Sequence, residues 1–379
     1  MSKINMADPF FTEEDRVKIH IGIDEILSGI LSMGHNVRAF EREFSELIRV
    51  PHAVAMNACT SALEAALIGL GVREGDEVIV PCETFIATGM AVHLVGGKPV
   101  FAEISERTFC LDFDDVQKRI TPRTKGIIIV YMGGLIPDDI LKFRNLCDDH
   151  GLFLVEDAAH APGASLQGKL AGSFGHAGCF SFYPTKVITA GEGGMLTTED
   201  ERLAEFARSF QHRGRDFTAP NEQYNQIGRN VRMTEMAALM GRIQLEHLHE
   251  YLAERCRVMR IYRQELKNDQ RVSLVIPDDE SASAYWKIPL IFDDKYDRCF
   301  ITKELKKAGI SVDWSYQPPL HLQPIFQKNY KTKVGHLPKS EHLLSHHICL
   351  PCHPRISDQD AVYVAKNIKS ILDKLDFVQ

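Results

Sequence analysis

The chain opens with hydrophobic residues spaced as in an amphipathic helix. Over the first 50 residues an apolar stripe recurs every three or four positions and predicts helical structure. The residues of this stripe are Ile23, Ile26, Leu27, Ile30 and Leu31, followed by Phe40, Phe44 and Ile48. A helical N-terminal region is therefore expected before the first strand.

Beyond residue 50, short apolar runs alternate with helical patterns. Strands are predicted at residues 53–56, 77–80, 99–103, 126–131 and 152–156. Helices are predicted at residues 60–70, 86–94, 113–120 and 138–150. The fourth strand is continuously apolar and β-branched, as is typical of a strand buried on both faces. This alternation predicts an α/β fold with a mostly parallel sheet flanked by helices.

The pattern changes near residue 230. Residues 236–267 form one long helical stretch or two, and a smaller unit follows. That unit is predicted to contain strands near residues 284–291 and 311–316 and a helix at 358–375. We expect a large α/β domain over residues 1–250 and a smaller C-terminal α+β domain over residues 251–379. No Gly/Ser/Pro-rich linker separates them, so firm packing is expected.

Composition and charge narrow the class of protein. Of the 379 residues, 44% are hydrophobic and 25% charged, as in an ordinary soluble protein. The net charge of -7 argues against a general affinity for nucleic acid. The longest nearly apolar run, at residues 126–136, is shorter than the roughly 20 residues that span a bilayer. With no secretion signal and nine scattered cysteines, we expect a cytoplasmic protein with no membrane partner.

The most informative segment, GCFSFYPTKVITAGEGGML at residues 178–196, contains one lysine. Ser181 lies in its strand-like run, Tyr183 follows, and Lys186 precedes a glycine-rich turn. Burial would lower the pKa of the Lys186 ammonium, because the charged form loses hydration. A neutral amine can form a Schiff base with an aldehyde. On spacing alone, a surface lysine at a loop edge is the better interpretation.

A carboxylate ends another predicted buried strand, in LVEDAAHAPGA at residues 154–164. Asp157 would be costly there without a partner, and a pyridinium nitrogen is one such partner. The carboxylate would keep such a ring protonated and make it an electron sink. The alternative is an N-cap for the following turn. His160, three residues on, has the alternative role of a hydrogen-bonded structural residue.

Two further strand ends carry candidate binding residues. At residues 57–67, NACTSALEAAL, small and hydroxyl side chains lead into a helix whose free N–H groups would suit a phosphate. Thr and Ser usually only cap a helix at such a place. At residues 81–85, Phe85 follows a strand and would stack on a flat ring, although core packing is the commoner role.

Taken together, these segments resemble the DegT/DnrJ/StrS family of sugar aminotransferases, which depend on pyridoxal 5'-phosphate (PLP). The resemblance covers residues 10–371. The matching motifs are DEVIVP at 76–81, TPRTK at 121–125, EDAAH at 156–160, SFYPTK at 181–186, GEGG at 191–194, GRNVRMTEMAA at 228–238 and LP at 350–351. The resemblance implies the fold type I aminotransferase architecture, a large PLP-binding α/β domain followed by a smaller α+β domain.

The resemblance also implies roles for residues around the cofactor ring. Lys186 is the Schiff-base lysine, and Asp157 pairs with the pyridinium nitrogen. Phe85 takes the place of the aromatic that stacks on the ring. His160 matches a position near the phenolic oxygen of the ring. Lys186 also argues against a sugar dehydratase, because relatives with that activity carry His in its place.

For the phosphate of PLP, the resemblance implies a cradle made of side chains and backbone. Thr60 and Ser181 match it, together with the backbone at Cys59, Thr60 and Ser61. Asn230 matches an asparagine that reaches the phosphate of the neighbouring subunit's cofactor. A homodimer with shared active sites is therefore implied.

The implied activity moves an amino group from an amino acid to a keto-sugar. The donor is expected to be L-glutamate, and the acceptor a nucleotide-linked sugar used to make amino-sugars of surface polysaccharides or glycosides. Substrate contacts are expected from loops that include residues 314–322. The individual candidates are Phe10, Tyr183, Arg213, Trp314 and His321.

The sequence departs from the family at three positions. Cys59 stands where Gly is usual, Arg213 where His often precedes Gly, and Tyr131 where many members have His. Alternatives to a sugar aminotransferase are an aminotransferase for a cyclitol ketone and a non-catalytic PLP-fold regulatory protein. The C-x-x-C at residues 349–352 also fits zinc or a redox pair, but no second ligand pair is evident, so no metal is expected.

Overall fold

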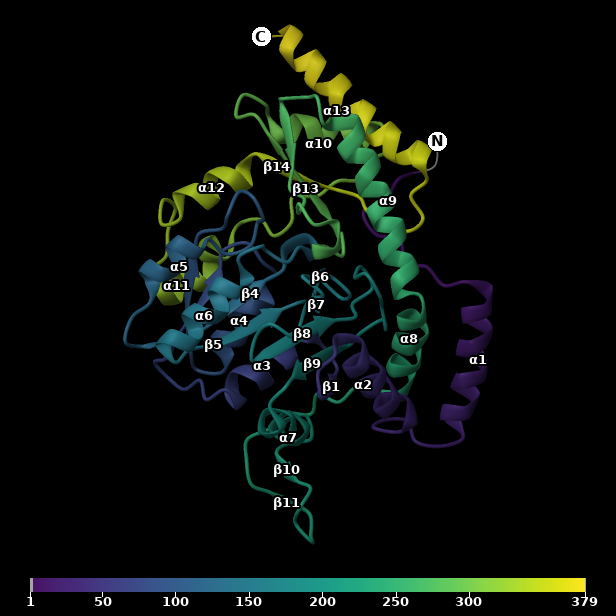
Figure 1. The fold of residues 1–379 in the computed structure, drawn as a ribbon, viewed down its shortest axis with the longest axis vertical. Helices are drawn as coiled ribbons and strands as arrows, with labels where there is room; N and C mark the ends of the chain where they lie inside the picture. The colour runs from purple at the N-terminus through teal and green to yellow at the C-terminus, as the bar shows by residue number, and fades with distance from the viewer. Residues whose placement is uncertain (1–2, 379) are drawn as a thin grey trace.

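The computed structural model describes residues 3–378 and centres on a seven-stranded sheet (Figure 1). The strand order is β1-β9-β8-β5-β4-β2-β3; β9 runs antiparallel to both of its neighbours, and the other neighbouring pairs are parallel. The strands are β1 (His52–Met56), β2 (Glu77–Pro81), β3 (Lys98–Ala102), β4 (Thr124–Val130), β5 (Phe153–Asp157), β8 (Ala177–Ser181) and β9 (Gly194–Thr198). The predicted mostly parallel α/β fold is confirmed.

Alternate residues of the strands enter two hydrophobic clusters, one on each face of the sheet. In β4, Ile127 and Ile129 belong to one cluster and Ile128 to the other, and all three are fully buried. Burial on both faces explains why this strand is continuously apolar. One face is covered by α2 (His35–Ile48), α5 (Phe113–Arg119) and α6 (Ile140–His150), the other by α3 (Cys59–Gly69), α4 (Ile86–Leu94) and α7 (Glu201–Phe210).

The C-terminal part of the chain builds a smaller antiparallel sheet with its own hydrophobic cluster. The helices α8 (Glu235–Glu246) and α9 (Leu248–Leu266) lead to it. Its strands are β12 (Val272–Leu274), β13 (Ile288–Phe292) and β14 (His347–Leu350), and its helices are α10 (Arg298–Lys307) and α13 (Asp358–Val378). The predicted domain boundary at residue 250 lies in the first turn of α9, and the division into residues 1–250 and 251–379 stays a prediction.

One segment of this C-terminal part packs on the large sheet. Leu320, Phe326 and Leu344 belong to the cluster on the α3–α4 face, and Leu320 N–H donates to Cys82 O at 2.8 Å. The segment therefore lies beside the carboxyl end of β2. It contains the short helices η3 (Leu320–Leu322), α11 (Pro324–Tyr330) and α12 (Pro338–Ser345). Of the helices within residues 3–378, none is long and apolar enough to cross a membrane.

The remaining elements are short. Two-residue strands form the pairs β6 (Ser165–Leu166) with β7 (Lys169–Leu170) and β10 (Arg215–Asp216) with β11 (Gln223–Tyr224). Figure 1 shows the β10–β11 hairpin projecting from the end of the molecule opposite α13. The single turns η1 (Met132–Gly134) and η2 (Glu280–Ala282) lie in connections.

The predicted N-terminal stripe is only partly correct. The region forms two helices, α1 (Glu13–Leu27) and α2, and Phe40 and Phe44 of α2 are fully buried as expected. Ile30 and Leu31 lie after the end of α1, at exposed fractions of 66% and 54%. Leu27 is 61% exposed, so this end of the stripe does not face the core of its own chain.

The strand predicted at residues 311–316 is wrong. Within that range the backbone makes one isolated bridge, between Asp313 and Cys349, and the chain then bends at Ser315, which has a positive φ of 46°. The strands that pair with β13 are β12 and β14, and the sequence pattern singled out neither. A left-handed residue interrupts the extended backbone that the apolar alternation suggested.

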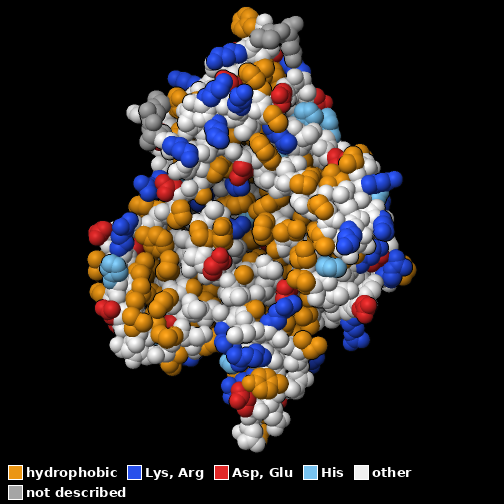
Figure 2. All heavy atoms as spheres, turned by 180° about the vertical axis from the view of Figure 1, so that it is seen from behind, with side chains coloured by type: hydrophobic (Ala, Val, Ile, Leu, Met, Phe, Trp, Pro, Cys, Tyr) orange, Lys and Arg blue, Asp and Glu red, His pale blue; other side chains and the backbone are white. Residues whose placement is uncertain are grey.

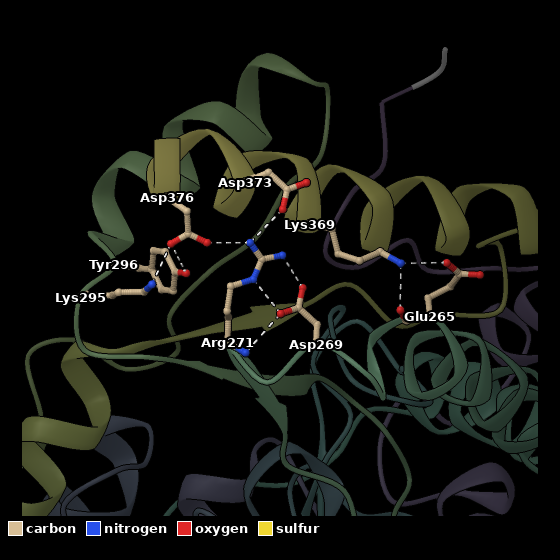
Figure 3. A network of polar contacts seen from close by, with 8 residues as sticks. All are labelled: Glu265, Asp269, Arg271, Lys295, Tyr296, Lys369, Asp373 and Asp376. Atoms are coloured by element: carbon tan, nitrogen blue, oxygen red, sulfur yellow. Dashed lines mark hydrogen bonds and ion pairs between the residues drawn. The ribbon is translucent and has the colours of Figure 1, made fainter. Parts of the chain in front are cut away.

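Figure 3 shows the ion pairs that fasten α13 to the small sheet. Arg271, just before β12, pairs with Asp373 and Asp376 of α13 at 2.8 and 3.0 Å. Asp376 also accepts hydrogen bonds from Lys295 and Tyr296. Exposed pairs of this kind are individually weak, but a shared network orders several side chains at once. The C-terminal helix is therefore anchored at its far end.

Candidate active site

The carboxyl ends of β5 and β8 and the start of α3 meet at a cavity of about 490 Å³. This is the edge of a parallel sheet at which ligands bind. The cavity brings together eight of the predicted residues, which are separated widely along the chain. They are Cys59, Thr60, Phe85, Asp157, His160, Ser181, Tyr183 and Lys186.

Lys186 lies in the cavity wall, in the loop that follows β8. Its backbone N–H donates to Tyr183 O at 2.9 Å and closes a tight turn. Burial lowers the pKa of the Lys186 ammonium to about 8, although the Asp157 carboxylate acts in the opposite direction. At pH 7 roughly one such lysine in ten is a neutral amine, against fewer than about one in a thousand for an exposed lysine.

Asp157, at the end of β5, faces three donors. Thr88 Oγ1 donates to Oδ2 at 2.7 Å, and Ala159 N–H donates to Oδ1 at 3.2 Å. Cys59 Sγ lies 3.9 Å from Oδ1. Burial raises the pKa of Asp157 overall, although these donors oppose the rise by stabilising the anion. The Ala159 contact is the turn-capping role that the sequence also allowed, and it occupies only one of the two oxygens.

The start of α3 offers backbone N–H groups to the cavity. Its N-cap residue, Ala58, makes no side-chain capping hydrogen bond. Gly194 of β9 comes so close that a Cβ added there would lie 2.3 Å from the carbonyl carbon of Ala58. Thr60 lines the cavity, whereas Ser61 Oγ donates to Asn57 Oδ1 at 2.7 Å and leaves its backbone N–H for a ligand. An anion is the ligand that such a helix start favours.

His160 is buried between two aromatic residues from the C-terminal part of the chain. Its ring stacks on Trp286 with centroids 3.8 Å apart and planes 18° apart, and its Nε2 lies 3.1 Å from Tyr316 Oη. Burial and the charges of Lys186 and Lys287 hold the pKa of His160 well below its usual value, so the imidazole is neutral. Its Nδ1 makes no hydrogen bond within the described residues.

Phe85 stands at the edge of the cavity rather than in the core. It is 55% exposed, and its ring centroid lies 5.6 Å from that of Tyr316. A phenylalanine used for core packing would be buried, because exposure forfeits most of its hydrophobic stabilisation. Phe85 is therefore not a core-packing residue of its own chain, and its stacking on a cofactor ring stays a prediction.

The predicted substrate residues are dispersed. Tyr183 lines the cavity. Phe10 lines a separate hollow of about 20 Å³, which is also lined by Lys186 and its neighbours. Trp314 packs beneath a guanidinium, 5.0 Å from its ring, and His321 is fully buried with its Nε2 2.9 Å from Glu341. Substrate contact by these residues stays a prediction.

Arg213 and Asn230 lie at the base of the projecting β10–β11 hairpin. Both are exposed, and neither is among the residues that line the cavity of the same chain. Arg213 adopts a left-handed φ of 67°, and Asn230 forms a backbone bridge with His212. Their predicted contacts with substrate and with a neighbouring subunit's cofactor are not tested by a single chain.

Sequence reasoning missed several residues that line the cavity. Thr88 lies in the first turn of α4, just after the strand-end segment at residues 81–85, so a search one helical turn further would have found it. Trp286 and Lys287 precede β13, and no local pattern connects them to Lys186. Tyr316 falls within the loop at residues 314–322 that was expected to contact substrate, although it was not singled out.

The two cysteines of the C-x-x-C segment have separate partners. Cys349 Sγ lies 3.0 Å from Ser315 Oγ, and Cys352 Sγ donates to Arg255 O at 3.5 Å. The expectation that the protein uses no metal stays a prediction. Within residues 3–378, the three possible ligands whose donor atoms lie within 4.8 Å of one another include neither cysteine; they are Asp294, His342 and His346.

The cavity fits PLP, the cofactor that the sequence resemblance implies. Lys186 supplies an amine that is partly neutral at physiological pH, and Asp157 supplies a buried carboxylate with hydrogen-bonded oxygens. The start of α3 supplies unpaired N–H groups for a phosphate. His160 Nδ1, buried and without a partner in the described chain, is available to a ring substituent. Each polar group of the cofactor therefore has a complementary group in one cavity.

Comparison with known proteins supports this assignment. A family profile described as the DegT/DnrJ/EryC1/StrS aminotransferase family matches residues 17–369. The chain is 43% identical to GDP-perosamine synthase of Caulobacter vibrioides, over 86% of this chain and 87% of that protein. It is 35% identical to a UDP-N-acetyl-3-dehydro-alpha-D-glucosamine 3-aminotransferase of Acidithiobacillus ferrooxidans, over 92% and 94%.

Solved structures agree with the sequence relatives. DesV of Streptomyces venezuelae superposes with a TM-score of 0.90 at 32% identity, covering 98% of each chain. Helicobacter pylori PseC, an aminotransferase involved in the biosynthesis of pseudoaminic acid, gives a TM-score of 0.90 at 27% identity over 98% of this chain and 100% of its own. The chain belongs to the DegT/DnrJ/EryC1/StrS aminotransferase family, a family of PLP-dependent sugar aminotransferases.

Proposed function

We propose that this protein transfers an amino group from L-glutamate to a nucleotide-linked keto-sugar, with PLP as cofactor. The observation that carries the proposal is the meeting of Lys186, Asp157 and the start of α3 in one cavity. Each feature alone has a structural explanation. Together they match the aldehyde, the ring nitrogen and the phosphate of a single molecule.

Side chains and backbone groups of the cavity would hold the cofactor. Lys186 Nζ would hold the aldehyde carbon, and Thr60 and Ser181 would hold the phosphate together with the N–H groups of α3. When bound, PLP supplies a protonated ring that takes up negative charge from a neighbouring carbon. Asp157 would keep the proton on the ring nitrogen, because the hydrogen bond from Thr88 favours the ionised carboxylate.

Lys186 would also move the proton during transfer. With a pKa of about 8, its neutral amine can accept the proton that leaves Cα of the amino donor. The resulting ammonium would pass that proton to the carbon that carried the aldehyde, which restores the neutral amine, and the second half-reaction would use the same amine in the opposite sense. Because one amine serves both halves, donor and acceptor use the same cavity in turn, and ping-pong kinetics should follow.

The acceptor class rests on what the relatives share. Their names specify sugars linked to GDP, to UDP and, in a Streptomyces venezuelae transaminase 33% identical to this chain, to dTDP. The base differs while the nucleotide-linked sugar recurs, so we propose a nucleotide-linked keto-sugar without choosing the base. A Bacillus subtilis relative at 33% identity is a spore coat polysaccharide biosynthesis protein, in keeping with a product used in a surface polysaccharide.

Two other functions fit the same fold. A cyclitol ketone would present a similar ring carbonyl to Lys186. A regulatory role is represented by a relative from Saccharopolyspora erythraea named a sensory transduction protein, at 35% identity. A pure binder needs neither a proton-transfer amine nor a charge-stabilising carboxylate, so Lys186 and Asp157 favour the enzyme. A visible absorption band that shifts when L-glutamate is added would exclude the binder.

We also propose a homodimer with shared active sites. Figure 2 shows hydrophobic side chains over much of the rear face of the molecule, above the projecting hairpin. The exposed hydrophobic residues include Leu27, Ile30 and, close in sequence to the hairpin, Ile227. A second copy would bury such side chains and could receive Asn230 at its cavity. The cytoplasmic location expected from the sequence stays a prediction.

Chemical trapping tests the proposed function directly. Borohydride reduction of the protein with PLP, followed by digestion and mass measurement, should place one pyridoxyl group on Lys186. The Lys186→Ala variant should lose turnover while it still binds PLP non-covalently, and the surface variant Lys169→Ala should behave like the native protein. Absence of the adduct, or full activity in Lys186→Ala, would refute the proposal.

A further inference from the structure

Trp286 connects the C-terminal part of the chain to Lys186 by two contacts. The side chain is 4% exposed and forms part of the cavity wall. Its Nε1–H donates to the backbone carbonyl of Thr185 at 2.6 Å, and the centre of its ring lies 4.3 Å from Lys186 Nζ. One indole therefore contacts both the lysine amine and the main chain immediately before it.

Other side chains hold this indole in place. His160 stacks on it at 3.8 Å with an interplanar angle of 18°. Lys287 Nζ lies 4.2 Å from the centre of the same ring and is itself paired with Asp313 at 2.5 Å. With a stacked ring, a second cation and a hydrogen-bonded N–H, the indole has little freedom to rotate. Its position relative to Lys186 is therefore well defined.

The backbone that carries the indole is docked against the large sheet. The turn after β4 contains Gly133 and Gly134, with φ of 67° and 97°. A Cβ at Gly133 would lie 2.8 Å from Lys287 O, and one at Gly134 would lie 3.2 Å from Ala284 N, besides 2.7 Å from His160 O. Ala284 N–H donates to Gly134 O at 2.9 Å. The close approach depends on the absence of side chains, so the two glycines let this segment reach the cavity.

We propose that Trp286 is a positioning residue for Lys186. Its ring face stabilises the free ε-ammonium by a cation–π contact, and its N–H fixes the adjoining backbone, so that the amine released during turnover stays at one place. The contact favours the charged amine, whereas burial favours the neutral one. The inference rests on Lys186 being the reactive amine of the proposed function, and it holds for any acceptor.

A titration of Lys186 in the protein without PLP tests the inference. Trace acetylation with acetic anhydride between pH 6 and pH 10, read by mass spectrometry on the Lys186 peptide, reports the proton affinity of this amine. In Trp286→Leu the affinity should fall roughly 3- to 30-fold, because the aromatic face is lost. In Trp286→Phe, which keeps a face but not the N–H donor, the fall should be smaller.

A matched control separates the cation–π contact from simple opening of the cavity. Tyr316→Leu removes an aromatic residue from the same wall and leaves the indole beside Lys186 in place. Its titration should stay within about twofold of the native protein. An unchanged titration in Trp286→Leu would overturn the inference, and so would an equal shift in Tyr316→Leu.

Two further readouts keep the result interpretable. Thermal unfolding would show whether Trp286→Leu is folded, and if it is not, Trp286→Phe must still lower the proton affinity more than Tyr316→Leu does. Failure of the proposed function has a different signature, namely no pyridoxyl adduct on the native protein. The titration uses no PLP, so its failure can be told apart from failure of the proposed function.

Discussion

Thr88 Oγ1 lies 2.7 Å from Oδ2 of Asp157, and both side chains are buried. Thr88 also shares a 2.8 Å hydrogen bond with Thr84. Because the one hydroxyl hydrogen of Thr88 points at the carboxylate, Thr84 is the donor in that bond. The two threonines thus form a short relay that favours an ionised Asp157 where burial alone would favour the neutral acid.

Removing the Thr88 hydroxyl should weaken catalysis more than it weakens folding. Thr88→Val keeps the shape but leaves Asp157 Oδ2 without its donor, so kcat/KM for the L-glutamate half-reaction should fall about 10- to 100-fold. Thr88→Ser restores a hydroxyl and should recover most of the loss. Single-turnover absorbance measurements would check both variants. Native rates in Thr88→Val would show that this contact does not support Asp157.

The rate at which the protein captures PLP should depend on pH through Lys186. Only the neutral amine attacks the aldehyde, and its pKa is lowered to about 8 by burial. The rate should therefore rise about tenfold per pH unit below pH 8 and level off above it. Stopped-flow absorbance between pH 6 and pH 10 would show this. A rise that continues to pH 10 would instead indicate an exposed amine.

Mixing two inactive variants should restore activity if active sites are shared. Lys186→Ala lacks the amine, and Asn230→Ala lacks the side chain that we expect to reach the partner's cofactor. Equal amounts that exchange subunits at random should give about a quarter intact sites. Activity assays before and after subunit exchange would measure the gain. If no activity returns although exchange is demonstrated by mass, Asn230 does not act across a dimer interface.

Glu77 should contribute stability that is lost in acid. Burial raises its pKa, but contacts with Thr121, Arg123 and Lys98 outweigh burial and lower the pKa to about 2. A lowered folded-state pKa stabilises the native protein above the unfolded value near 4.5, and the contribution disappears as pH falls toward 2. Glu77→Gln should therefore lower the free energy of unfolding by about 2 kcal/mol at pH 7.

Urea unfolding at two pH values would test the Glu77 prediction. At pH 3.5 the difference between Glu77→Gln and the native protein should shrink by roughly two-fifths, because the unfolded carboxyl is then mostly protonated. The exposed neighbour variant Glu74→Gln should change stability little at either pH. A Glu77→Gln deficit that is equal at both pH values would mean that packing, and not charge, explains the effect.

Much of the fold could be predicted because the strands of the large sheet are buried on both faces. The run that became β4 is short and β-branched, which favours a strand, and Ile127, Ile128 and Ile129 do lie in the two hydrophobic cores. The exposed end of the N-terminal stripe shows that an apolar pattern does not always predict burial in the core of the same chain. An apolar stripe at Leu27 indicates that something covers it, but not whether the cover belongs to the same chain.

Some residues of the candidate site could likewise be predicted from the sequence, and others could not. Lys186 and Asp157 could be found because each follows a strand of a parallel sheet, where topology fixes the edge at which they meet. Trp286 could not be found, because it reaches the cavity from another part of the chain through a close backbone contact at Gly134. The strand expected at residues 311–316 failed because a left-handed Ser315 overrides the local alternation.

At Gly133 and Gly134 the segment bearing the indole comes so close that an added Cβ would lie 2.8 Å from Lys287 O or 3.2 Å from Ala284 N. Gly133 and Gly134 do not line the cavity with Lys186, yet they set how closely the segment bearing the indole approaches its amine. A larger residue at either glycine would push this segment away from the turn after β4 and move the indole away from Lys186. Residue size at these two positions is therefore a marker, readable from any related sequence, of whether the amine is held in the same manner.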